Sequence, residues 1–147
     1  MARTVLNRSM RTVIVYESMY GNTRSIAEAI AGGLRVGGLD AELVAAPDAP
    51  GLGAVDVLVV GAPTHVHRLP TARTRHAAVT AAHKEGTSLR LEPRAADSAL
   101  REWLRALPRL DATKVAGYDT RMPGPPILTG RASKLIARQL HKEMLRV

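Results

Sequence analysis

The sequence contains no cysteine and no phenylalanine, and only one tryptophan and three tyrosines among its 147 residues. The absence of cysteine excludes disulfides, thiolate metal sites and thiol nucleophiles. Because aromatic residues make up only 3% of the chain, its core must be built from Val, Leu, Ile and Ala. The chain also lacks an apolar run of about 20 residues, the length of a membrane-spanning helix, so we expect no membrane partner.

Hydrophobic residues make up 46% of the chain, which is enough for a globular core. A length of 147 residues predicts a single domain over residues 1–147, since domains commonly run to roughly 100–200 residues. Residues 1–11 are basic and predict a flexible N-terminal arm. They lack the apolar segment of a signal peptide, so we expect a cytoplasmic protein.

The chain is basic, with a formal net charge of +8 and arginines spread along its length. Such a charge indicates either a solvated basic surface or attraction to an acidic partner. Non-specific contact with nucleic acid is the weaker interpretation, because few aromatic side chains are available to stack on bases. We therefore expect an acidic protein partner.

Short apolar runs alternate with helical patterns along the chain. The expected strands are residues 12–17, 41–45, 55–61 and 114–118, and the expected helices are residues 23–36, 71–83, 98–107 and 131–145. Residues 47–53 predict a loop in place of a helix. The alternation predicts right-handed crossovers and a doubly wound parallel α/β sheet.

A polar loop follows the first expected strand and opens the first expected helix. Its residues are Ser18, Met19, Tyr20, Gly21, Asn22 and Thr23. The first N–H groups of a helix have no partner within it, and the helix dipole adds a favourable potential for anions. The hydroxyl and amide side chains can add donors, and Gly21 allows close backbone approach. The loop therefore predicts a phosphate site.

This loop has neither the Gly-x-Gly-x-x-Gly of dinucleotide folds nor the Gly-Lys-Ser/Thr ending of the P-loop. It resembles the FMN-phosphate loop of the flavodoxin family, Ser/Thr-x-Ser/Thr-Gly-x-Thr, with Tyr20 in place of the middle hydroxyl residue. The resemblance implies the strand order 2-1-3-4 and FMN as cofactor. It implies that residues 18–23 hold the phosphate by backbone N–H and hydroxyl groups.

Two further loops, residues 63–68 and 119–124, follow the third and fourth expected strands. The resemblance implies that they clasp the isoalloxazine ring between them. The side chains so implied are Pro63, Thr64 and His65 on one side and Asp119, Thr120 and Arg121 on the other. Family members usually stack an aromatic residue on the ring, but neither loop has Trp or Phe. We therefore expect weaker flavin binding, with His65 or His67 stacking instead.

Several of these residues have a second interpretation. His65 and His67, with two more histidines nearby, can be read as metal ligands, but no carboxylate completes the set and we expect no metal. Asp119 can cap backbone N–H groups instead of contacting the ring. Trp103 falls at the helical spacing of core residues and predicts packing rather than stacking on a ligand.

The pattern ends without the fifth strand of the flavodoxin family, so the fourth strand is expected at an exposed edge that favours association, for example as a homodimer. The resemblance implies electron transfer, as a carrier or as a small flavin-dependent oxidoreductase. We expect no protein side chain to be catalytic. The alternative is a non-catalytic module of the same fold that holds no flavin and acts by protein interaction.

Overall fold

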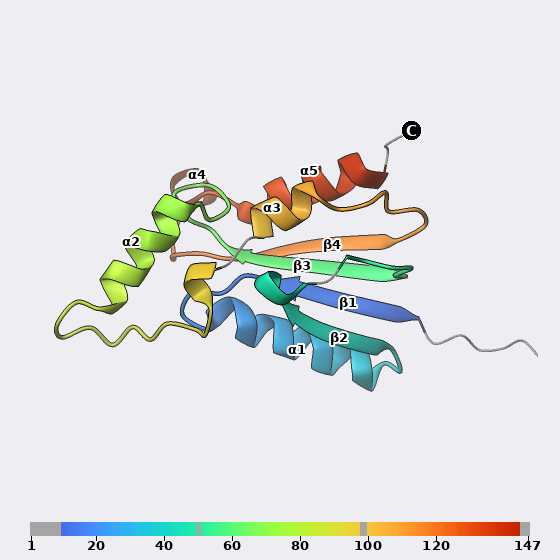
Figure 1. The fold of residues 1–147 in the computed structure, drawn as a ribbon, viewed down its shortest axis with the longest axis horizontal. Helices are drawn as coiled ribbons and strands as arrows, with labels where there is room; N and C mark the ends of the chain where they lie inside the picture. The colour runs from blue at the N-terminus through green and yellow to red at the C-terminus, as the bar shows by residue number, and fades with distance from the viewer. Residues whose placement is uncertain (1–9, 50, 98–99, 145–147) are drawn as a thin grey trace, which may run out of the picture.

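Four parallel strands form one sheet with helices on both faces (Figure 1), in a computed structural model that describes residues 10–49, 51–97 and 100–144. The strands are β1 (Arg11–Tyr16), β2 (Asp40–Ala45), β3 (Val57–Pro63) and β4 (Lys114–Thr120). Their order is β2-β1-β3-β4, which confirms the predicted doubly wound α/β fold.

The helices follow the predicted pattern closely. They are α1 (Asn22–Val36), α2 (Ala72–Ala82), α3 (Leu100–Arg105), α4 (Pro126–Thr129) and α5 (Ala132–Met144), with 3₁₀ turns η1 (Ala46–Asp48) and η2 (Ala95–Asp97). In the described part of the crossover from β2 to β3, only η1 replaces a helix. No helix among the described residues is long and apolar enough to cross a membrane.

Several element boundaries differ from the sequence prediction by a few residues. Arg11, which was expected in the N-terminal arm, begins β1, because its N–H donates to Asp56 Oδ2 at 2.8 Å; residues 1–9 lie outside the described residues. Pro63 and Asp119–Thr120, which were expected in loops, belong to β3 and β4, because the ladder continues to the pair Pro63 and Thr120. The predicted loop after β4 contains the short helix α4.

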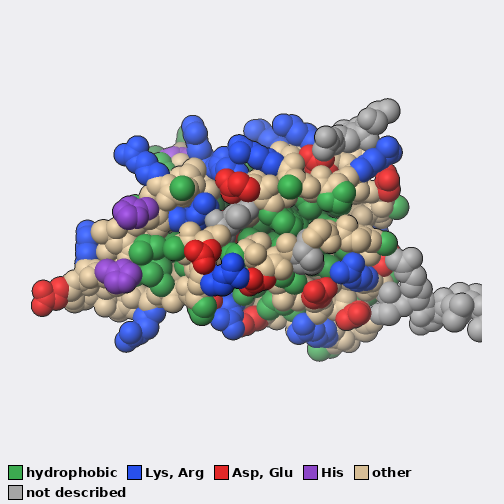
Figure 2. All heavy atoms as spheres, viewed as in Figure 1, with side chains coloured by type: hydrophobic (Ala, Val, Ile, Leu, Met, Phe, Trp, Pro, Cys, Tyr) green, Lys and Arg blue, Asp and Glu red, His purple; other side chains and the backbone are tan. Residues whose placement is uncertain are grey.

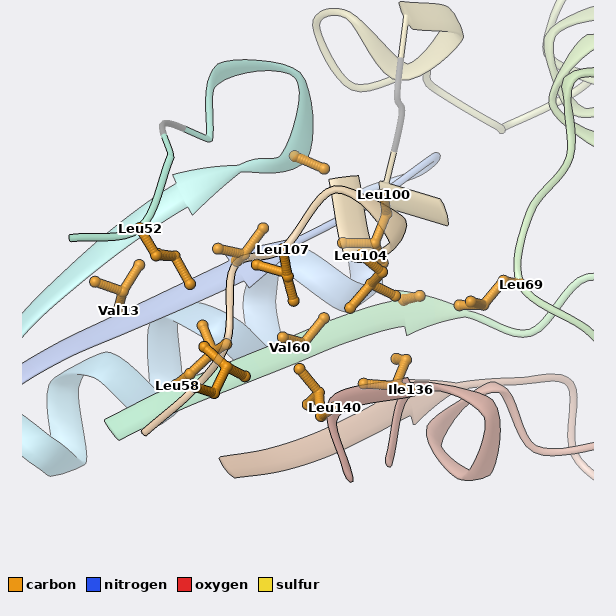
Figure 3. Packing of buried hydrophobic residues seen from close by; sticks show 14 of the residues in the cluster. Val13, Leu52, Leu58, Val60, Leu69, Leu100, Leu104, Leu107, Ile136 and Leu140 are labelled. Carbon is orange, nitrogen blue, oxygen red and sulfur yellow. The ribbon is translucent and has the colours of Figure 1, made fainter. Parts of the chain in front are cut away.

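The core has two layers because β1 is buried on both faces, as parallel strands in such sheets are. Val13 and Val15 join a cluster with α3 and α5, to which Leu104 and Ile136 contribute (Figure 3). On the other face, Ile14 packs against the alanines of α1. Aliphatic side chains thus fill both layers, as the low aromatic content predicts.

β4 is an edge strand among the described residues, since its ladder is with β3 alone. Ala116 and Gly117 are exposed there. They line an open groove together with Ala137 and Leu140 of α5. The expected exposed edge is therefore present in the described fold.

The ring of Tyr118 lies across Gly61 of the neighbouring strand. A Cβ on Gly61 would fall 1.9 Å from Tyr118 Cζ, so only glycine fits at this position of β3. The Tyr118 hydroxyl donates to the carbonyl of Thr23 at 3.0 Å, and burial raises the pKa of this phenol above its usual value. Tyr118 therefore stays protonated and ties β4 to the head of α1.

Replacing Gly61 by alanine should lower the free energy of unfolding by about 1–3 kcal/mol, because the added methyl group displaces the Tyr118 ring. The measurement is urea unfolding followed by circular dichroism. Gly33→Ala is the matched control, since nothing lies within 4 Å of its Cβ position in α1, and it should stabilise by about 0.5–1 kcal/mol. Equal stabilities for the two variants would contradict the placement of Tyr118.

Candidate functional site

Three loops meet where β1, β3 and β4 end. Thr23 Oγ1, at the start of α1, is hydrogen-bonded to Thr120 Oγ1 at 2.7 Å. The backbone N–H of Thr64 donates to the carbonyl of Thr120 at 2.8 Å. Thr120 therefore joins the loop after β1 and the loop after β3 to its own strand end, and the sequence prediction that these loops share one sheet edge holds in the structure.

The first loop has the backbone of an anion site. Gly21 is the N-cap of α1 with φ 94°, a left-handed conformation that glycine adopts without strain. Its N–H donates to Ser18 Oγ at 3.1 Å. Asn22 is exposed at the first position of α1, where N–H groups have no partner within the helix. The head of α1 can therefore receive an anion from the solvent side.

The other side chains of this loop are turned inward or sideways. Met19 and Thr23 are buried, and Thr23 Oγ1 is already hydrogen-bonded to Thr120. The Tyr20 hydroxyl donates to the carbonyl of Ala78 in α2 at 2.7 Å. The Tyr20 side chain is thus directed to α2 and fixes that helix.

A carboxylate that the sequence patterns did not reveal lies over this loop. The N–H of Glu92 donates to the Met19 carbonyl at 2.8 Å, and Glu92 Oε2 accepts from Arg24 Nη1 at 3.2 Å. Glu92 Oε1 lies 3.1 Å from where a Cβ on Gly21 would be. The chain therefore places a negative charge of its own at the head of α1, where the dipole favours one.

A small open pocket of about 230 Å³, with both polar and apolar side chains in its lining, separates the second and third loops. It is lined by Thr64, Val66, His67, Met122, Leu128 and Thr129. Its large apolar side chains face solvent, with Val66 77%, Met122 76% and Leu128 70% exposed. These exposed apolar side chains give the pocket an apolar side against which a ligand could pack.

Strained backbone shapes one wall of this cavity. Val66 and His67 have φ values of 46° and 65°, which non-glycine residues rarely adopt. The turn is closed by two hydrogen bonds between the backbones of His65 and Arg68, at 2.8 and 3.0 Å. Strain of this kind is typical of functional loops, and here it turns His67 rather than His65 toward the cavity.

The remaining predicted residues hold the loops in place. Thr64 Oγ1 accepts from the N–H of Ala132 at 3.0 Å, and Asp119 Oδ2 accepts from the N–H of Ser133 at 2.8 Å. Both side chains therefore cap α5, which supports the capping interpretation of Asp119. Arg121 Nη1 donates to the carbonyl of Gly130 at 3.3 Å and so braces the third loop.

A buried ion pair anchors α2 beside the site. Glu17, at the end of β1, has a side chain with no exposed surface, and its Oε1 lies 3.5 Å from Arg75 Nη1. His65 Nδ1 is hydrogen-bonded to Thr74 Oγ1 at 3.2 Å. Burial, and then the positive charge of Arg75, lowers the pKa of His65, so its imidazole is neutral at neutral pH.

The histidines do not assemble a metal site in the part of the chain that the structure describes. No group of three His, Asp or Glu side chains has a metal-binding arrangement there. His65 is engaged with Thr74, while His83 Nδ1 lies 2.8 Å from the carbonyl of Val79 on its own helix. These contacts give the two histidines structural roles.

A flavin mononucleotide fits this arrangement in two respects and meets resistance in one. The left-handed Gly21 and the head of α1 suit a phosphate, and the pocket between the second and third loops offers apolar side chains to a ring. Glu92 is the opposing group, because its carboxylate lies over Gly21. A phosphate at the head of α1 would lie close to a charge of the same sign.

The comparisons with known proteins agree with this geometry. The family model described as flavodoxin matches residues 14–105, which include the first loop and the β3 strand end. A solved structure described as a flavodoxin from the domain Archaea is similar in fold, with a TM-score of 0.56 at 19% sequence identity. The alignment covers 94% of this chain and 78% of that chain. No curated protein matches the chain.

The environment of His65 predicts a loss of stability in acid. Because its pKa is lowered from 6.5 in the folded state, the unfolded chain binds the proton more tightly. The contribution is fully present above pH 6.5 and is lost as the pH falls toward the folded-state pKa. Urea unfolding at pH 7.5 and at pH 5 should show a smaller decrease for His65→Gln than for the unchanged chain. His76→Gln, at an exposed position of α2, is the control and should keep the full decrease.

Proposed function

Because the chain belongs to the flavodoxin family, we propose that it binds one FMN non-covalently at the three loops and takes part in electron transfer. The observation that carries the proposal is the junction at Thr120, which gathers an anion-type loop and a partly apolar pocket at one sheet edge. Doubly wound sheets bind ligands beyond the carboxyl ends of their strands, and flavodoxins are themselves an established example of this rule.

The loops divide the cofactor between them in this proposal. The phosphate lies at the head of α1, held by the backbone N–H groups that follow Gly21 and by the amide of Asn22. The ring lies in the cavity between His67 and Leu128. Thr64, His65, Asp119 and Arg121 act mainly by holding these loops, through the contacts to α2, α5 and Gly130, and Pro63 ends the ladder of β3 with β4.

The flavin supplies the electron chemistry when bound, and the protein sets its surroundings. Val66, Met122 and Leu128 would pack their exposed apolar side chains against a bound ring and so exclude water from the face that they cover. Arg68 and Arg121 place positive charge on the two loops that bound the cavity, which favours the arrival of electrons. His65 is neutral near pH 7 and adds no charge.

The proposed partner is an acidic protein that exchanges electrons with the flavin. A groove beside His67 is lined by Arg131, Lys134 and Arg138, so basic side chains adjoin the proposed ring site. In Figure 2, Lys and Arg side chains gather along the upper edge of the molecule, where α5 lies in Figure 1. An acidic surface docked there would bring its redox group close to the ring.

We propose two alternative roles for the chain: an electron carrier or a small flavin-dependent oxidoreductase. We also propose that it acts in the cytoplasm. The visible absorption spectrum of the purified chain, followed by FMN titration with fluorescence quenching, tests the flavin. Consumption of NAD(P)H with a quinone acceptor would then identify an oxidoreductase. Absence of flavin bands and of quenching would favour the alternative, a module that acts by protein interaction.

Analytical sedimentation tests a separate proposal, that two copies of the chain pair through the exposed edge of β4.

Leu128→Asn should weaken FMN binding about tenfold or more, because the bound ring would bury a leucine side chain that is 70% exposed in the free chain, and full burial of leucine contributes about 1.5–3 kcal/mol. Val36→Asn is the matched control, since Val36 is 92% exposed at the end of α1 and lies outside the proposed site. Fluorescence quenching gives both affinities, and circular dichroism shows that both variants are folded. Equal affinities for the two variants would remove Leu128 from the ring site.

A further inference from the structure

The head of α1 is covered by a segment that belongs to the same chain. The backbone of Glu92 is fixed by its hydrogen bond to the Met19 carbonyl at 2.8 Å. Its side chain is only 22% exposed, and one carboxylate oxygen lies 3.1 Å from the Cβ position of Gly21. The carboxylate therefore lies beside Gly21, next to the head of α1 where the family resemblance puts a phosphate, and its backbone is hydrogen-bonded to the same loop.

Arg24 has an acidic partner besides Glu92, so the Glu92 carboxylate is not needed to balance the charge of Arg24. Arg24 Nε already contacts Glu28 Oε1 at 2.8 Å, one helical turn along α1. Glu92 is the second carboxylate on the same guanidinium, at 3.2 Å. The group of Arg24, Glu28 and Glu92 thus carries one positive and two negative charges, and its negative excess lies beside Gly21.

A carboxylate in this position distinguishes a ligand with a terminal hydroxyl group from a ligand with a terminal phosphate. It accepts hydrogen bonds and donates none, so a hydroxyl group can bind to it directly. A phosphate monoester carries a charge of about −1.5 to −2 at pH 7 and has only acceptor oxygens in its ionised form. Glu92 therefore favours a ligand that ends in a hydroxyl and opposes one that ends in a phosphate.

We propose that Glu92 is a specificity-determining residue that makes the chain bind riboflavin at least as tightly as FMN. This inference rests on the proposed flavin site and concerns only the end of the ligand that meets α1. The ring site between the second and third loops is common to both flavins. The ratio of the two affinities therefore isolates the head of α1 from the remainder of the site.

The experiment measures the dissociation constants of FMN and riboflavin by fluorescence quenching, for the unchanged chain and two variants. Glu92→Gln keeps the shape of the side chain and removes its charge, and should tighten FMN binding about tenfold, which corresponds to about 1.4 kcal/mol. Riboflavin affinity should change much less. Glu28→Gln is the matched control, because it removes the other carboxylate on Arg24 one helical turn farther along α1, and it should shift the affinity ratio much less than Glu92→Gln does.

The outcomes separate this inference from the function on which it rests. Tighter binding of FMN than of riboflavin by the unchanged chain, with a ratio that Glu92→Gln does not move, would overturn the role of Glu92 and leave the flavin site standing. Failure of all three proteins to bind either flavin would overturn both. Circular dichroism verifies folding, and Glu92→Ala, which also removes the charge, must shift the ratio in the same direction as Glu92→Gln.

Discussion

The arrangement of the site depends on one residue at the end of β4. Thr120 is hydrogen-bonded through its hydroxyl to Thr23 and through its carbonyl to the N–H of Thr64. These contacts require β1, β3 and β4 to run parallel and to end at the same level, which their ladders ensure. A shift of one residue in the register of β4 would turn the Thr120 side chain to the opposite face of the sheet and separate the three loops.

The same strand end shows how a chain with three tyrosines uses one of them. Tyr118 packs across Gly61, and its hydroxyl reaches the carbonyl of Thr23. The ring fills space that an aliphatic side chain would leave open, and its polar tip satisfies a carbonyl at the head of α1. Two residues of β4 therefore fix the start of α1. Tyr118 is hydrogen-bonded to the carbonyl of Thr23, and Thr120 to its hydroxyl.

Much of the fold could be predicted from local patterns, whereas the details of the site could not. Continuous apolar runs identified the strands, and the residues from Ser18 to Thr23 identified the loop, because both signals lie within a few neighbouring residues. Glu92 meets Arg24 across 68 positions of sequence, so no spacing rule reveals the pair. His67, and not His65, lines the cavity because Val66 and His67 have positive φ values. Sequence patterns alone do not predict those φ values.

The distribution of charge separates two tasks that the net charge of +8 conceals. Basic side chains on α5 lie at the surface, where they act over the distance of about 8–10 Å that salt allows and can attract an acidic partner. The head of α1 is instead covered by a carboxylate in direct contact with the loop. Short contacts outweigh screened distant charges, so the ligand end meets a local negative charge within a basic protein. The proposed attraction of a partner and the proposed selection of a ligand therefore rest on separate groups of side chains.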